Sequence, residues 1–154
     1  MPELFSTTSV LAGYEISTDR ARLDVDLIHD VLRTSYWAEG RPREIVERSI
    51  AASLCFGVYE QNPDRTGRQV AFARVITDEA VFGYLADVFV VPDARGRGIA
   101  KGLVRAILSH PDLQTLTVFL LRTRDAHGLY AQFGFGSVPR PDELMSLTAT
   151  RPRT

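Results

Sequence analysis

The stretch 84–110 constrains the fold more than any other part of the chain. It contains an apolar, β-branched run, Val88–Val91, which is typical of a strand buried on both faces. Pro92 ends this run, because proline has no N–H for a ladder of hydrogen bonds. From Ile99 the apolar residues recur with the period of a helix, until Pro111 follows the end of the pattern. The sequence therefore predicts a buried strand, a short turn and an amphipathic helix.

The turn between this strand and this helix predicts a binding site for an anion. Gly96 and Gly98 allow a ligand to come close to the backbone, and Arg95 and Arg97 add positive charge. The free N–H groups of a helix's first turn, with their partial positive charge, favour a phosphate. An isolated G-x-G is as often a plain connector with solvated arginines. The whole order of strand, proline, arginine, glycines and helix is more specific, and it favours the anion site.

With Phe89-Val90-Val91-Pro92 followed by Arg95-x-x-Gly98-x-Ala100, the chain resembles the GNAT superfamily of acyl-CoA N-acyltransferases. The resemblance implies that amides of this turn hold the pyrophosphate of coenzyme A. It also implies that the end of the strand pairs its backbone with the pantetheine arm. By this resemblance, the residues that bind acetyl-CoA are Phe89, Val90, Val91, Arg95, Gly96, Arg97, Gly98, Ile99 and Ala100.

A second segment, 126–135, matches the family pattern A-x-x-L-Y-x-x-x-G-F within a helix expected over residues 123–135. The family's tyrosine falls on Tyr130, which by this resemblance protonates the departing thiolate. A phenol suits that step because it holds its proton at neutral pH yet can give it to a strongly basic leaving group. Thr123 stands where many relatives have an asparagine that touches the cofactor. His127, one helical turn from Tyr130, is either an acceptor contact or a surface residue.

A dinucleotide-binding fold is the competing interpretation of the glycine turn. Gly96, Gly98 and Gly102 follow a strand, but the usual fingerprint needs its third glycine where Lys101 stands. Too little chain remains after this turn for the further βα repeats of such a fold. The sequence therefore favours the GNAT interpretation.

Composition bounds the class of protein. The chain has 154 residues, 45% of them hydrophobic, so we expect a flexible leader over residues 1–13 and one domain over residues 14–150. A formal net charge of −1 gives no footprint for nucleic acid, so no such partner is expected. No apolar run approaches the roughly 20 residues that cross a bilayer, and the first residues lack the order of a signal peptide. A cytoplasmic protein with no membrane partner is expected.

Cys55 is the only cysteine, which excludes an internal disulfide and a cysteine-based metal site.

Periodicity and turn residues predict further elements along the chain. Helices are expected over residues 24–34 and 42–53, and strands over residues 14–17, 54–60, 68–76, 115–121 and 144–148. The fold class is therefore α/β (α+β). The resemblance implies a single GNAT-like domain with a mixed, mostly antiparallel, twisted sheet flanked by helices.

Four residues are candidates for contact with the acceptor. By the resemblance, the connection between the first two helices lines the acceptor pocket, which suggests Tyr36, Trp37 and Glu39 there, with His127 as a further candidate. An aromatic pair beside a carboxylate suits a cationic amine, although the two rings would equally pin the loop to the core.

Asp87 is the one carboxylate in the central strand, and such a group is costly to bury unless it is paired. Three roles stay open for it. It could bind the acceptor's ammonium, act as a general base directly or through water, or cap a backbone turn.

The function that the resemblance implies is transfer of an acetyl group from acetyl-CoA to a primary amine by direct attack, without a metal. The loop at residues 36–39 favours a small cationic acceptor, while an amino acid, a protein N-terminus or a lysine also fits. A non-catalytic acyl-CoA sensor and a nucleotide-binding protein that prefers NADPH are the alternatives from other classes. Dimers are common in the family, so a homodimer is compatible with the resemblance.

Overall fold

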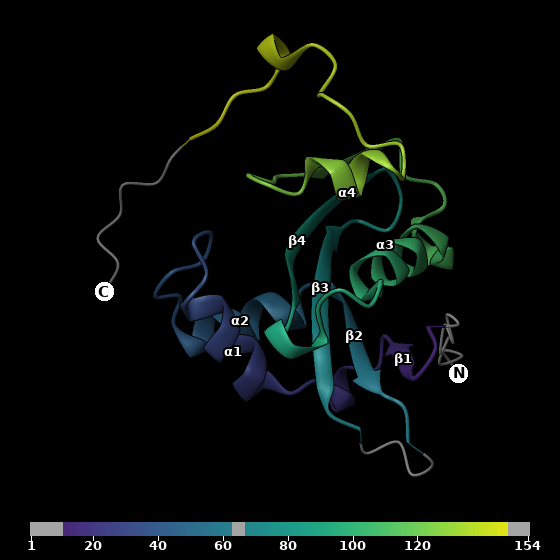
Figure 1. Cartoon of the computed structure of the whole chain (residues 1–154). Coiled ribbons are helices and arrows are strands. Elements are labelled where there is room, and N and C mark those ends of the chain that lie inside the picture. Colours follow the sequence, from purple (N-terminus) through teal and green to yellow (C-terminus); the bar gives the residue numbers. More distant parts are fainter. Residues whose placement is uncertain (1–10, 63–66, 148–154) are drawn as a thin grey trace.

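The computed structural model describes residues 11–62 and 67–147, and Figure 1 shows them as a sheet with helices on both sides. The sheet has five strands in the order β1-β2-β3-β4-β5. The strands are β1 (Tyr14–Ser17), β2 (Leu54–Glu60), β3 (Gln69–Thr77), β4 (Phe82–Val90) and β5 (Val118–Leu121), and the helices are α1 (Val25–Arg33), α2 (Arg43–Ala51), α3 (Ile99–Ser109) and α4 (His127–Ala131). Short 3-10 turns occupy Arg20–Arg22, Pro92–Ala94, Pro111–Leu113 and Pro141–Glu143.

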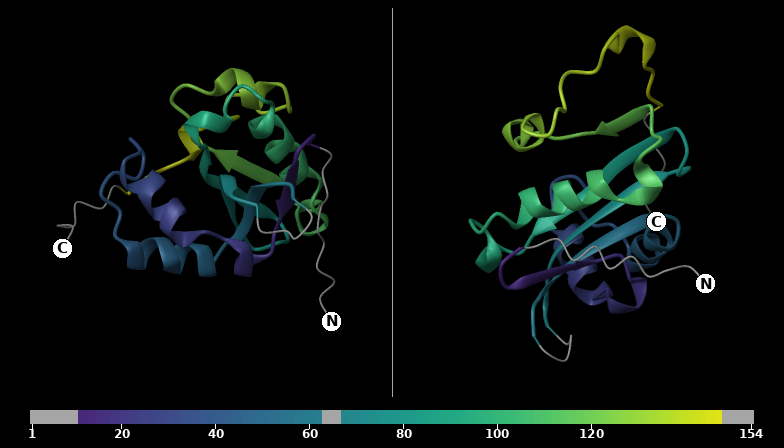
Figure 2. Two further views of the ribbon diagram at one scale, coloured as in Figure 1. Left: turned by 60° about the horizontal axis from the view of Figure 1, so that its bottom comes forward. Right: turned by 90° about the vertical axis from the view of Figure 1, so that its right-hand side faces the viewer.

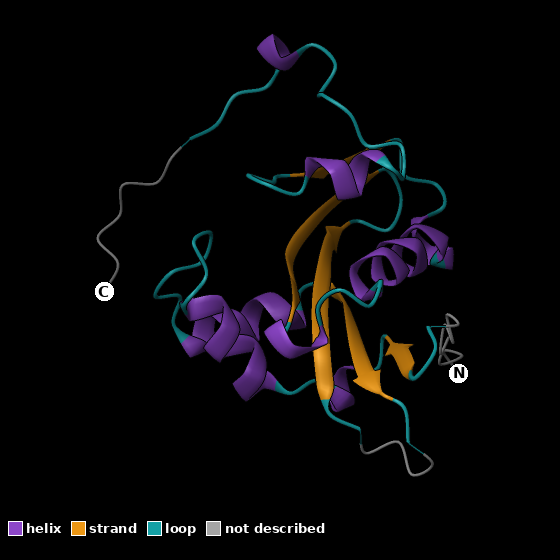
Figure 3. Cartoon of the chain, in the orientation of Figure 1, coloured by secondary structure: helices purple, strands orange, loops and turns teal. Residues whose placement is uncertain are grey.

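The sheet is antiparallel from β1 to β4, and only β5 runs parallel to its neighbour, β4. The helix α3 makes the crossover between these two parallel strands, as a parallel pair requires. Helices α1 and α2 lie on one side of the sheet and α3 on the other (Figures 1 and 3). This architecture confirms the expected α/β fold with a mixed, mostly antiparallel sheet.

The hydrophobic core lies between the sheet and its helices. Strands β2 and β3 are buried over most of their length because helices cover both of their faces. The largest side chains that are fully buried come from all of these layers: Phe56, Phe72, Ile16, Ile28, Leu32, Ile99, Leu103, Ile107, Val46, Val58, Val70 and Val75.

Strand β4 contains a bulge at its centre. Phe72 faces Phe89 and Arg74 faces Ala86, so one residue of β3 stands opposite two residues of β4. Asp87 is one of those two, and its φ of 56° lies in the left-handed region. A bulge bends its strand and redirects the side chains around it. The continuous apolar run Val88–Val91 in the sequence gave no sign of this irregularity.

Strands β4 and β5 pair over only four residues, from Phe82 opposite Val118 to Leu85 opposite Leu121. Beyond Leu85 the two strands separate, as the right-hand view of Figure 2 shows. Within the described residues, β4 from the bulge onward therefore has β3 on one edge and no strand on the other.

The C-terminal part of the chain differs from the expectation. A last strand was expected at residues 144–148, but residues 144–147 form none, and the chain leads away from the sheet (Figure 1). Met145 and Leu147 are 99% and 96% exposed, so nothing here buries the apolar residues whose pattern suggested a strand. Residue 148 lies outside the described residues.

Two further elements are shorter than the sequence predicted. The helix expected over residues 123–135 is reduced to α4, and the strand expected from residue 115 begins at Val118. The expected leader lies mostly outside the described residues, although Leu11 pairs with Tyr14 through the backbone. The boundary between leader and domain remains a prediction.

Tyr59 supplies a test of the packing of β2. The residue is 2% exposed, and its hydroxyl has no hydrogen-bond partner among the described residues. Burial raises the pKa of Tyr59, and Arg22 stacks on its ring at 4.2 Å. A buried hydroxyl without a partner costs free energy, so Tyr59→Phe is expected to raise the free energy of unfolding by about 1 kcal/mol. Urea denaturation measures this change, with Tyr84→Phe, at a half-buried position, as the control with no gain. A clear loss of stability in Tyr59→Phe would contradict the prediction.

Candidate active site

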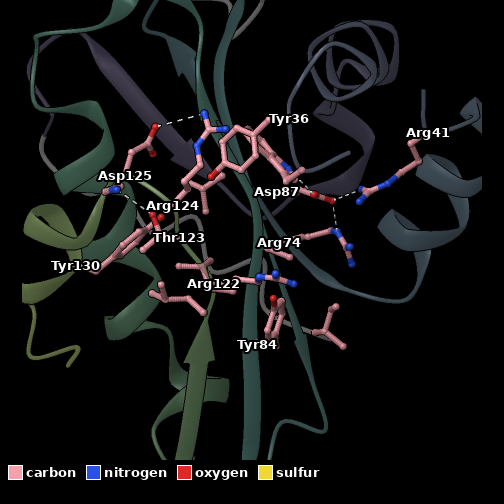
Figure 4. A pocket seen from close by; sticks show the side chains of 17 residues that line it. Tyr36, Arg41, Arg74, Tyr84, Asp87, Arg122, Thr123, Arg124, Asp125 and Tyr130 are labelled. Atoms are coloured by element: carbon pink, nitrogen blue, oxygen red, sulfur yellow. Dashed lines mark hydrogen bonds and ion pairs between the residues drawn. The ribbon is translucent and has the colours of Figure 1, made fainter. Parts of the chain in front are cut away.

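A cavity of about 880 Å³ opens where β4 and β5 separate. Its walls come from the loop between α1 and α2, from β3, from β4 around the bulge, and from the segment between β5 and α4 (Figure 4). The lining residues are Tyr36, Trp37, Arg41, Arg74, Ile76, Tyr84, Leu85, Ala86, Asp87, Val88, Leu121, Arg122, Thr123, Arg124, Asp125, Ala126 and Tyr130.

Asp87 is the centre of a buried ion cluster in the wall of this cavity. Its Oδ2 accepts hydrogen bonds from Arg74 Nε at 2.6 Å and from Arg41 Nη1 at 2.8 Å. Its Oδ1 accepts one from Trp37 Nε1 at 3.1 Å. Arg74 also donates from Nη1 to the hydroxyl of Ser53 at 3.0 Å. Both carboxylate oxygens are therefore engaged, and the Asp87 side chain is 2% exposed.

This cluster joins parts of the chain that lie far apart in the sequence. Asp87 belongs to β4, Arg74 to β3, and Trp37 and Arg41 to the loop after α1. Three donors already occupy the Asp87 oxygens that a base or an ammonium ligand would use, and all three are side chains. The geometry therefore favours a structural role for Asp87, as the centre of an ion cluster and not as the cap of a backbone turn.

Tyr130 lies on α4 and faces the cavity. The residue is 7% exposed, and its ring packs against Phe135 with 5.9 Å between centroids. Burial raises the pKa of Tyr130, and the nearby Tyr36 adds to the same effect. The phenol therefore keeps its proton at neutral pH, which is the state that a general acid needs.

The acceptor candidates from the loop after α1 separate in space. Tyr36 and Trp37 line the cavity as an edge-to-face pair with 5.1 Å between centroids. The guanidinium of Arg124 covers the ring of Tyr36 at 3.7 Å. Glu39 and His127 are both exposed, and neither lines the cavity.

Thr123 has a local structural role as well as a place in the cavity wall. Its hydroxyl accepts a hydrogen bond from the N–H of Ala126 at 2.9 Å, just before α4 begins. The shorter threonine thus organises the turn at the position where the family often has asparagine.

A second hollow, of about 170 Å³, lies at the start of α3. Gly96 and Gly98 adopt φ values of 78° and 77°, which glycine tolerates without the strain of a side chain. Gly98 is the N-cap of α3 and supplies no side-chain hydrogen bond, so N–H groups of the first turn remain for a ligand. The lining residues are Val90, Ala94, Arg95, Gly96, Gly98, Ile99, Ala100 and Lys101.

The residues expected to bind the cofactor do not all reach this hollow. Arg97 turns toward β1 and donates from Nη1 to the Tyr14 hydroxyl at 2.9 Å. Phe89 is buried against Phe72, with 5.9 Å between centroids. Val91 is also buried, and its N–H donates to Val70 O at 2.9 Å. Val90 is the member of the strand end that lies in the hollow, and Arg95 donates from Nε to its carbonyl at 3.0 Å.

Most of the basic side chains of the site were not predicted from the sequence. Arg41, Arg122 and Arg124 come from loops without periodicity, and Lys101 was noted only as an obstacle to a dinucleotide fingerprint. Arg74 could have been found, because a charged residue within an apolar strand is the same signal that drew attention to Asp87.

Comparison with known proteins assigns the family. Residues 52–136 match the family model for the acetyltransferase (GNAT) domain. A Gibberella zeae protein whose name assigns it as an acetyltransferase is 34% identical over 133 residues, which cover 74% of this chain and 74% of that protein. The chain belongs to the GNAT acetyltransferase family, and the resemblance inferred from its two motifs is confirmed.

Solved structures agree with this assignment. A crystal structure of a GNAT family protein from Xanthomonas campestris pv. campestris has 50% sequence identity and a TM-score of 0.83, over 88% of this chain and 93% of that one. A Clostridium acetobutylicum protein crystallised with acetyl-CoA shares the fold at 18% identity and a TM-score of 0.61, over 88% of this chain and 94% of that one. The prediction of an acetyl-CoA-dependent acetyltransferase is therefore confirmed at the level of the GNAT type.

Membrane-spanning helices and clusters of metal ligands are both absent from the described residues. No helix in residues 11–62 and 67–147 is long and apolar enough to span a membrane. The same part of the chain contains no group of three or more histidine, cysteine, aspartate or glutamate side chains arranged to hold a metal ion.

The ion cluster predicts a large effect of changing Asp87. Asp87→Asn keeps the shape but removes the charge that balances the buried guanidinium of Arg74, so it is expected to lower the free energy of unfolding by about 3 kcal/mol. Asp93→Asn is the control, because Asp93 pairs with Arg68 on the surface and its loss is expected to have little effect. Chemical denaturation of both variants measures the difference. An Asp87→Asn protein of unchanged stability but altered pH–rate profile would instead favour the role of a base.

Proposed function

We propose that the protein transfers the acetyl group of acetyl-CoA to a primary amine by direct attack, with Tyr130 as general acid. The observation that carries the proposal is the arrangement of the two hollows along one strand. Val88 lines the large cavity and Val90, two residues further along β4, lines the hollow at the start of α3. A ligand that lies along the free edge of β4 can therefore reach both.

The donor would bind with its pyrophosphate at the start of α3. The uncapped first turn offers N–H groups there, and Arg95 and Lys101 add positive charge. The pantetheine arm would follow the free edge of β4, where Val88 and Val90 direct backbone groups away from β3. In an antiparallel ladder, successive residues direct their backbone groups to opposite sides of the strand. The N–H of Val91 donates to β3, so the backbone groups of its neighbour Val90 point to the free edge.

The chemistry uses groups of the cavity and of the neighbouring edge of β4. The neutral amine attacks the thioester carbonyl, so that a C–N bond forms and the C–S bond breaks. A backbone N–H on the free edge of β4, near Val90, would stabilise the oxyanion that develops. Tyr130 gives its proton to the departing thiolate, the proton of the amine leaves to water in the open cavity, and the Tyr130 phenolate takes a proton back from that water.

Asp87 acts in this scheme as a positioning residue. It holds Arg41, Arg74 and Trp37 in the cavity wall, and it fixes the bulge of β4 beside the reacting groups. A non-catalytic acyl-CoA sensor would have the same donor site, so turnover separates the two functions.

Removal of the Tyr130 hydroxyl tests its catalytic role. Tyr130→Phe is expected to lower kcat by about 10²–10⁴-fold, the usual range for loss of a general acid, while the KM for acetyl-CoA stays nearly the same. The ring contact with Phe135 is retained, so the fold should be preserved. Release of free CoA thiol measures the rate, and Tyr59→Phe serves as a matched control that leaves the cavity unchanged. An unaltered kcat in Tyr130→Phe would remove this residue from the mechanism.

A negative charge at the start of α3 tests the donor site. Gly98→Glu places a carboxylate among the N–H groups that would hold the pyrophosphate, and it is expected to weaken acetyl-CoA binding at least tenfold by repulsion. Gly40→Glu is the matched control, because Gly40 also has a positive φ, of 69°, and open space around its Cβ position, yet lines neither hollow. Calorimetric titration with acetyl-CoA measures both. Equal affinities in the two folded variants would contradict the proposed donor site.

A further inference from the structure

The large cavity carries more positive than negative charge. Four arginines and two aspartates line it, which leaves a formal excess of two positive charges. These residues are Arg41, Arg74, Arg122 and Arg124, with Asp87 and Asp125. The charge of the lining bears directly on the acceptor that enters.

Both aspartates are already close to arginines. Asp87 holds Arg41 and Arg74 at 2.8 Å and 2.6 Å. The carboxylate of Asp125 lies 4.0 Å from Arg124. The buried Asp87 carboxylate is therefore no ready partner for an ammonium group on the acceptor, and the carboxylate of Asp125, which is 70% exposed, lies beside a guanidinium.

Arg122 is the one arginine of the cavity lining that pairs with neither aspartate. It directly follows β5, at the point where β4 and β5 separate, and it is exposed. In Figure 4 its side chain points into the cavity, on the side of Arg74 and Tyr84. Within residues 11–62 and 67–147, its guanidinium makes no ion pair and no hydrogen bond with the protein.

We infer that the acceptor is an amine that also carries an oxyanion, a carboxylate or a phosphate, and that this oxyanion binds Arg122. The inference rests on the proposed function, because it names the acceptor class of that same cavity. A guanidinium offers a planar fork of N–H donors that matches either oxyanion in a bidentate geometry. The nearby Arg74 and Arg41 add to the positive potential that draws such a group in.

The same potential suits the chemistry of the amine. Only the neutral amine attacks the thioester, and positive surroundings favour the neutral form over the ammonium. An oxyanion on the acceptor supplies the attraction that brings the molecule in, while its nitrogen is held in the reactive form. A polyamine would instead bring further positive charge into a cavity that already has an excess.

The expectation of a small cationic acceptor rested on Tyr36, Trp37 and Glu39. In the structure, Arg124 covers the ring of Tyr36, the indole of Trp37 donates to Asp87, and Glu39 does not line the cavity. The groups that would recognise a cation are thus engaged or elsewhere. The arrangement favours an acceptor of the opposite charge.

The test compares amines that differ in one charged group. Tyrosine is paired with tyramine, and O-phosphoethanolamine with ethanolamine, while spermidine represents the cationic class. The rate of CoA thiol release at saturating acetyl-CoA gives kcat/KM for each. The carboxylate or phosphate member of a pair is expected to be favoured by at least tenfold, and the preference should shrink as the salt concentration rises. The pair with the larger ratio identifies which oxyanion is bound.

Variants of Arg122 connect the preference to this residue. Arg122→Gln is expected to lower kcat/KM for the favoured acceptor by about 10–100-fold and to leave the KM for acetyl-CoA unchanged. Arg122→Lys should restore part of the loss, because it keeps the charge without the fork. Arg48→Gln, an equal change of charge at an exposed position of α2 outside the cavity, should have no effect.

Several outcomes would overturn the inference. A preference for spermidine or for the member of each pair that lacks the oxyanion would do so, as would an Arg122→Gln variant that affects only the KM for acetyl-CoA. Silence with every amine despite normal acetyl-CoA binding would exclude a small oxyanion-bearing acceptor and leave the donor site standing. Failure of the protein without substitutions to bind acetyl-CoA would instead contradict the proposed function itself.

Discussion

The buried ion cluster around Asp87 is the interaction on which the site depends. A carboxylate that is 2% exposed is tolerated only because two guanidiniums and an indole N–H satisfy it. The cluster ties the loop after α1 to the middle of the sheet, and it coincides with the bulge that bends β4. Loop, bulge and cavity wall therefore form one connected unit, and none of them is independent of the charge at Asp87.

The bulge has a second consequence, which concerns the edge of β4. Strand β5 ends at Leu121, opposite Leu85 and just before the bulge of β4, so the two strands pair over four residues and then separate. The separation opens the cavity and leaves a backbone edge that ends at the start of α3. Both hollows lie along this edge, with Val88 in one and Val90 in the other. The fold thus provides, from one irregularity, a place for the reaction and a path for a long donor.

Much of the fold could be predicted from the sequence, because its signals are local. The run of β-branched residues before Pro92 and the helical period after Ile99 specify β4 and α3 without reference to the rest of the chain. The two glycines between them likewise specify the turn locally, because its positive φ values are free of strain only for glycine. The apolar pattern near residue 145 was misleading for the opposite reason: a strand needs a neighbour, and the pattern cannot say whether one is present.

The sequence by itself determined the family, the turn at the start of α3 and the position of Tyr130, because each depends on residues close together in the chain. Only the tertiary structure decided the charge of the cavity. Arg41, Arg74 and Arg122 lie on three separate segments, and their convergence on one space follows from the pairing of strands and the bulge. Whether Asp87 is free or paired depends on the same long-range contacts. Electrostatic potential is a sum over groups that are near in space, so it can be read only after the chain has been folded.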